Sequence, residues 1–119
     1  MLGEAAEPGQ WVYQDGNNGW KKAIGTSAAA AHARGMVISD GLGSVSFLSG
    51  QTVDIVTEGR VSGFSNMTPG AAVYVSPDTA GEGDPRGSTT GEYLCFGGYA
   101  WDDESIMVKP QVQLPAQVA

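Results

Sequence analysis

Residues 51–81 read QTVDIVTEGRVSGFSNMTPGAAVYVSPDTAG, and the alternation of side chains in this stretch decides the fold class. Val53, Ile55 and Val61 occupy odd positions, whereas the even positions from 52 to 62 are mostly polar. A period of two is typical of a β-strand that buries one face. The stretch therefore predicts short strands separated by turns.

Three residues of this stretch are predicted to shape its turns. Gly59 interrupts the alternating run, where a bulge or a tight turn would fit. In Thr68-Pro69-Gly70, proline fixes φ and glycine tolerates a positive φ, which is the chemistry of a turn. We therefore assign structural roles to Gly59, Pro69 and Gly70, with a strand resuming at 73–75.

The composition extends this reading to the whole chain. The chain has 119 residues, enough for one domain with a modest core. Its 18 glycines, 6 prolines and only 16% charged residues favour an all-β domain rich in turns. We predict a small antiparallel β-barrel or sandwich of about seven to nine short strands, with at most one short helix. Residues 1–119 form this single β domain, with an extended N-terminal arm (1–10), a β core (11–109) and an extended C-terminal arm (110–119).

Individual elements can be placed along the chain. The run 11–13 and Trp20 flank a turn-rich Asp15–Gly19 segment and predict an opening hairpin. Ala28–Ala31, preceded by Ser27 as a cap, predicts the one short helix. Further strands are expected at 36–38, around Val45 and Phe47, at 93–99, and at 106–108, and a long exposed loop at 76–92. The 93–99 strand is apolar on both parities, so it is expected to be buried on both faces, either centrally or by another subunit.

Four features carry a resemblance to a known family: Gly50-Gln51, Val53, Ile55-Val56, and the run from Thr68-Pro69-Gly70-Ala71 to Tyr74-Val75-Ser76. This pattern resembles small head proteins of tailed bacteriophages, the decoration, cement or head-stabilisation proteins. The chain departs from their pattern after Ser76.

The resemblance implies a structural virion protein that binds the outer surface of the mature capsid and stabilises it. It implies a homotrimer at local threefold axes, with the major capsid protein as partner. It also implies a location on the virion after synthesis in the host cytoplasm. Two alternatives stay open: another virion part, such as a head-fibre base or a tail or baseplate adaptor, and a host-glycan-binding module that uses Trp11, Trp20 and Trp101.

Charge argues against nucleic acid as a partner, and hydropathy argues against a membrane. The net charge is −7, and the six Lys and Arg residues are scattered, whereas nucleic-acid binding depends on clustered cations. The N-terminus lacks the pattern of a signal peptide, and no apolar run approaches the ~20 residues of a membrane span. We expect no nucleic-acid and no membrane partner.

The side chains that could carry chemistry are isolated or lie in turns. Cys95 is alone and reads as a buried strand residue, and His32 has no second His or Cys partner. The carboxylates of Asp102–Glu104 lack the spacing of a calcium loop. We therefore predict no catalytic residue, no metal site and no cofactor, and a protein that is not an enzyme.

Contact residues are predicted in two places. The arm has little apolar surface of its own, so a partner is expected to order it through Leu2, Glu4, Glu7 and Pro8. The strand that is apolar on both faces supplies Tyr93, Phe96 and Tyr99 as the second set of capsid or subunit contacts.

Overall fold

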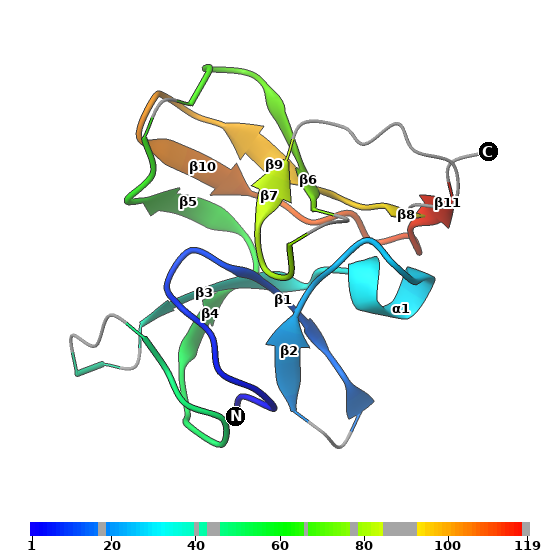
Figure 1. Cartoon of the computed structure of the whole chain (residues 1–119). Coiled ribbons are helices and arrows are strands. Elements are labelled where there is room, and N and C mark those ends of the chain that lie inside the picture. Colours follow the sequence, from blue (N-terminus) through cyan, green and yellow to red (C-terminus); the bar gives the residue numbers. More distant parts are fainter. Residues whose placement is uncertain are drawn as a thin grey trace.

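The described part of the chain forms two main antiparallel sheets, a separate pair of strands and one short helix (Figure 1). A computed structural model describes residues 1–16, 19–39, 41–42, 46–65, 67–76, 79–84 and 93–117. The first sheet has the order β2-β1-β3-β4, and the second has the order β5-β10-β9-β6-β7. The first comprises β1 (Trp11–Gln14), β2 (Trp20–Lys22), β3 (Gly35–Ser39) and β4 (Asp54–Val56).

The second sheet comprises β5 (Gly59–Ser62), β6 (Ala72–Val75), β7 (Gly83–Asp84), β9 (Phe96–Ala100) and β10 (Ser105–Val108). A separate pair is formed by β8 (Tyr93–Leu94) and β11 (Ala116–Gln117). The predicted small all-β fold is confirmed, as a sandwich and not a closed barrel. The described residues form more strands than expected because three of them are only two residues long.

The opening hairpin and the helix follow from local sequence. β1 and β2 pair antiparallel, and the Asp15 amide donates to the Gly19 carbonyl at 2.9 Å to close the hairpin. The helix α1 (Ala28–Ala31) starts where the Ser27 hydroxyl accepts a hydrogen bond from the Ala30 amide at 3.2 Å. The chain leaves the helix after one turn and enters β3.

The alternating stretch 53–62 crosses from one sheet to the other. β4 ends at Val56 in the first sheet, and β5 begins at Gly59 in the second. Gly59 has a φ of +142°, a backbone conformation that side chains disfavour. The glycine thus lies at the point where the chain changes sheets, instead of at a bulge inside one strand.

The Thr68-Pro69-Gly70 turn is closed and fastened to the next hairpin. The Ala71 amide donates to the Thr68 carbonyl at 3.0 Å, and Gly70 has a φ of +85°. The Gly70 amide also donates to the Ala100 carbonyl at 2.8 Å. These bonds place the turn beside the residues that link β9 to β10.

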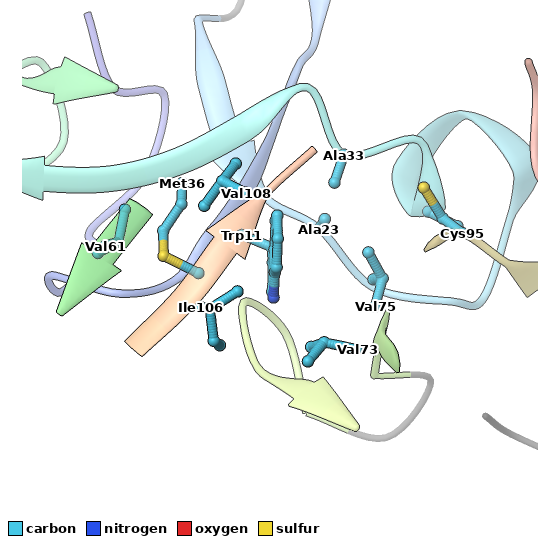
Figure 2. Close-up of a cluster of buried hydrophobic side chains, with 11 residues drawn as sticks. Trp11, Ala23, Ala33, Met36, Val61, Val73, Val75, Cys95, Ile106 and Val108 are labelled. Carbon is cyan, nitrogen blue, oxygen red and sulfur yellow. The ribbon is translucent and has the colours of Figure 1, made fainter. Parts of the chain in front are cut away.

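The main core fills the space between the two sheets, with Trp11 at its centre (Figure 2). Trp11 and Met36 come from the first sheet, while Val73, Ile106 and Val108 come from the second. A Cβ on Gly97 would lie 2.7 Å from the Trp11 ring, so the absence of a side chain there lets the indole reach the second sheet.

A second core lies on the opposite face of the first sheet. Val12 and Val37 follow Trp11 and Met36 in sequence and therefore point the other way, toward Phe47. The N-terminal arm covers them with Leu2, which is only 2% exposed, and with Ala6. The first sheet is thus buried on both faces.

This placement corrects the expectation that the arm has too little apolar surface to order without a partner. The arm is extended, but it is hydrogen-bonded to its own domain: the Leu2 amide donates to the Gln51 carbonyl at 2.9 Å, and the Trp20 amide donates to Met1 at 3.0 Å. A Cβ on Gly19 would lie 2.7 Å from the Met1 carbonyl oxygen, so the hairpin is shaped to accept the arm. The apolar pairs in β1 and β3 supply the surface that the arm covers.

The stretch 93–99 also differs from the expected single strand. It is divided at Cys95 into β8, which pairs with β11 of the C-terminal arm, and β9, which lies between β10 and β6. Of the strand expected around Val45 and Phe47, Val45 falls outside the described residues, and Phe47 forms an isolated bridge with Ala6; parts of the 76–92 loop also fall outside. Within that loop β7 adds to the edge of the second sheet.

We predict that Gly70→Val lowers the free energy of unfolding by about 1–3 kcal/mol, because a β-branched residue is strained at this positive φ. No atom lies within 4 Å of the site of a Cβ, so the cost isolates backbone strain. Gly70→Asn, which tolerates a positive φ, is the matched control and should cost less. Urea unfolding measures both, and equal stability of the two variants would contradict the turn geometry.

We predict that Leu2→Ala destabilises the protein by about 2–5 kcal/mol, because it leaves a cavity under the arm. Deletion of residues 1–9 should cost more, since it also removes the backbone hydrogen bonds of the arm. Pro8→Ala, at an exposed position, serves as the control and should have little effect. Thermal unfolding followed by circular dichroism tests this, and an unchanged midpoint after the deletion would show that the arm does not belong to the core.

Candidate functional site

The outer face of the five-stranded sheet, turned away from the core, carries a cluster of aromatic and apolar side chains. On β6 and β10 these residues alternate with core residues: Tyr74 lies between Val73 and Val75, and Met107 lies between Ile106 and Val108. On β9, Phe96 and Tyr99 flank two consecutive buried glycines, where the pairing with β6 shifts register. Neighbours of inward residues on a strand point outward. We define the outer face as Arg60, Ala72, Tyr74, Phe96, Tyr99, Trp101 and Met107.

Strand register aligns four of these residues straight across the sheet. Met107 pairs with Arg60 on β5 and with Tyr99 on β9. Tyr99 in turn pairs with Ala72 on β6. Side chains at paired positions lie on the same face, about 5 Å apart, so this row is a continuous surface and not a set of scattered residues.

Two pairs of aromatic rings contact each other on the outer face. The Tyr74 and Phe96 rings meet edge to face, with centroids 5.9 Å apart. The Tyr99 and Trp101 ring centroids are 6.5 Å apart, and Trp101 is 49% exposed. A bulge at Val73 and Tyr74 brings Tyr74 opposite Phe96. The bulge therefore helps to create the aromatic cluster.

A polar network fixes the Trp101 end of the face. The Arg60 guanidinium pairs with an Asp102 carboxylate oxygen at 2.7 Å and donates from Nε to the Ser105 hydroxyl at 3.0 Å. Ser105 donates to the other Asp102 oxygen at 2.8 Å, and the Glu104 amide donates to that oxygen at 2.9 Å. The Glu104 amide, the Ser105 hydroxyl and the nearby Arg60 lower the pKa of Asp102. Asp102 is thus an ionised cap of the 101–104 turn.

This network also positions Arg60 over the indole. The guanidinium carbon lies 6.0 Å from the Trp101 ring centroid, within cation–π range. Because Arg60 and Asp102 neutralise each other, the outer face presents aromatic surface with little net charge, on a protein whose net charge is −7. Aromatic residues, Met and Arg are the residue types enriched at the centres of protein interfaces. The arrangement suits contact with another protein.

The predicted contact residues fall in different places. Phe96 and Tyr99 belong to the outer face, whereas Tyr93 is half-buried against the main core. Leu2 is buried within its own domain and is not accessible to a partner in this conformation. Glu4 accepts a hydrogen bond from the Lys22 amide at 2.8 Å, and Glu7 and Pro8 are exposed.

Sequence reasoning missed Arg60, Tyr74 and Met107 as members of this face. Tyr74 and Met107 stand inside apolar runs, Val73–Val75 and Ile106–Val108, where flanking core residues hide their opposite orientation. The alternation was the available signal: the flanking valines and isoleucine mark the inner face, so the residue between them must point outward.

The other residues that the sequence suggested for chemistry or sugar binding lie where a structural role explains them. A His32 ring nitrogen lies 3.3 Å from the Gln111 carbonyl oxygen, which ties the segment after α1 to the C-terminal arm. Trp11 is buried, so the three tryptophans do not form one platform. Within the described part of the chain, no group of three or more His, Cys, Asp or Glu residues is placed to hold a metal ion.

Comparisons with known proteins gave no match, whether with family models, curated proteins or solved structures. No helix in the described ranges is both long enough and apolar enough to cross a bilayer.

Cys95 yields a prediction about pH. Burial raises the pKa of this thiol to about 11, and a hydrogen bond with the Ala33 backbone opposes the shift only in part. The folded state therefore holds the proton more tightly than the unfolded chain, whose thiol titrates near 9. Stability from this group is complete below pH 9 and is lost as pH rises toward 11.

We therefore expect the free energy of unfolding of the wild type to approach that of Cys95→Ala as pH rises from 9 to 11. The variant is less stable at neutral pH because of its cavity, but it lacks the titrating thiol, so the difference between the two proteins isolates Cys95. Urea unfolding at several pH values measures it. A constant difference would show that the thiol is accessible to solvent.

Proposed function

We propose that this protein is a structural component of a tailed-phage virion, a decoration protein that binds the outside of the mature head as a homotrimer and stabilises it. The observation that carries the proposal is the segment 50–76, whose pattern resembles that of such proteins and which supplies β4, β5, the Thr68–Gly70 turn and β6. Its partners are the major capsid protein and other copies of itself. It acts in the virion, without catalysis and without a cofactor.

The outer face supports this proposal as the surface that meets the capsid. It combines exposed aromatic surface with a neutralised charge pair, while the rest of the chain is acidic. The Thr68–Gly70 turn that the resemblance highlights borders this face, because it is hydrogen-bonded to Ala100 beside Trp101. The resembling motif and the outer face thus meet at one end of the second sheet.

The stabilising mechanism would be mass action. A protein that binds the expanded head and not its precursor or its dissociated subunits adds its binding free energy to the assembled state. A small contact suffices, because many copies act together on one shell. The low net charge of the outer face removes a repulsive barrier that an acidic surface would otherwise bring to the contact.

The test measures how fully Trp101→Asp and Leu48→Asp occupy mature heads. The heads come from the parent phage and are prepared without this protein. Leu48 is 73% exposed. It lies away from the outer face, in the segment between Phe47 and Gln51, both of which are hydrogen-bonded to the N-terminal arm. We expect Trp101→Asp to reduce head occupancy about tenfold or more, since interface aromatics contribute about 2 kcal/mol or more. Leu48→Asp should bind like the wild type.

Occupancy is read from gel-band ratios on purified particles, and melting curves verify that both variants fold. If the wild type does not bind mature heads, the proposed function is wrong. If both variants bind fully, the capsid contact lies elsewhere on the protein.

A host-glycan-binding module is the second candidate, favoured by the exposed Trp101 ring beside Tyr99, with the polar groups of Arg60 and Asp102 at its edge. Aromatic rings flanked by hydrogen-bonding groups can stack on sugars. A glycan array distinguishes the candidates, because binding abolished by Trp101→Asp would support this function in place of head binding.

A further inference from the structure

The segment 110–115 presents apolar side chains to solvent from an ordered backbone. Val112 is 92% exposed and Leu114 is 68% exposed. Between Lys109 and Val112, Gln111 fixes the chain: its amide donates to the Phe96 carbonyl at 2.9 Å, and its side-chain oxygen accepts from the Phe96 amide at 2.8 Å. Gln111 also donates to the Gln113 carbonyl at 2.9 Å. The two apolar side chains are therefore held outward, not carried on a loose end.

A complementary hollow opens elsewhere on the same molecule. A pocket of about 300 Å³ lies at the mouth between the sheets, beside the Thr68–Gly70 turn. Its wall is mostly apolar, and Trp11, Phe64, Met67, Val73 and Ile106 line it. This volume is at the lower end of the range for ligand sites, so it suits one or two apolar side chains better than a large molecule.

Charge favours a second copy of this chain as the occupant. Copies with a net charge of −7 repel each other, so opposite charges on the two sides of a contact would favour their association. Exposed Lys109 precedes the apolar pair Val112 and Leu114, and exposed Glu82 lines the pocket. Lys109 lies three positions before Val112 on one side of such a contact and Glu82 lies in the pocket wall on the other, so the two sides carry opposite charges.

We infer that copies of this chain associate head to tail, with Val112 and Leu114 of one copy seated in the Trp11–Ile106 pocket of the next. The surfaces that meet are different, so the contact is heterologous and forms a ring when its rotation closes. The inference rests on the proposed homotrimer for the number of copies, and it assigns the subunit contact to the tail segment and the pocket, which adjoin the outer face at Phe96 and Ala72.

The main experiment uses two variants that damage opposite sides of the contact. The tail variant is Val112→Asp with Leu114→Asp, and its control is Gln113→Asp in the same segment. The pocket variant is Ala71→Arg, which places a long charged side chain in the pocket from an exposed wall position, and its control is Ala29→Arg on the exposed side of α1. All five substituted positions are solvent-exposed, and circular dichroism melting verifies that each variant folds.

We expect the wild type and both controls to sediment as trimers, and each damaged variant to sediment as a monomer. An equimolar mixture of the two damaged variants should form a heterodimer, because the pocket variant retains a tail and the tail variant retains a pocket. A contact between identical surfaces would give no such rescue. The inference is overturned if the mixture stays monomeric, if both damaged variants remain trimers, or if the wild type is monomeric up to about 1 mM, where affinity is negligible.

A charge exchange gives a second, independent test. Lys109→Glu and Glu82→Lys should each weaken association about two- to fivefold, the range for exposed ion pairs, and the double variant should recover it. Recovery supports the pairing, whereas additive losses contradict it. Binding of the wild type to heads is measured separately. The head-to-tail contact can therefore be wrong while the protein still binds heads, and the protein can fail to bind heads while the contact is correct.

Discussion

The structure depends on the contact of Trp11 with glycines of the second sheet. A side chain on Gly97 would overlap the indole ring, and a Cβ on Gly83 would lie 2.9 Å from its nitrogen. Both positions therefore have to be glycine for the two sheets to approach over this large residue. Burial of a tryptophan contributes more apolar surface than any other side chain can, which matters in a domain with a modest core.

The same alternation that buries Trp11 on one side of the first sheet turns Val12 to the other side, and the N-terminal arm covers it. The molecule thus has a third layer made of a single extended segment. The arm contributes Leu2 and Ala6 to the second core, so it is an integral part of the fold. Because the arm is occupied in this way, contacts with partners are left to other surfaces.

Two surfaces remain available, and they have different chemistry. The outer face has aromatic rings on flat sheet, with Arg60 and Asp102 neutralised at its edge. The 110–115 segment exposes Val112 and Leu114 after Lys109, and the pocket has a mostly apolar wall that includes Glu82. A flat aromatic surface suits a partner of different sequence, whereas a protrusion and a hollow on one molecule suit repeated copies. In the proposed function, such an arrangement would allow one subunit to contact the shell and its neighbours at the same time.

The sequence alone determined the all-β class, the single helix turn after Ser27, the opening hairpin and the Thr68–Gly70 turn, because these depend on near neighbours in the chain. Only the tertiary structure decided that β4 and β5 lie in different sheets, that the run 93–99 is divided between two sheets at Cys95, and that the arm belongs to the core. The outer face emerged from register across four strands, which aligns residues far apart in sequence. Local pattern gives the orientation of a side chain, but the identity of what covers it is set by long-range pairing that no short window of sequence contains.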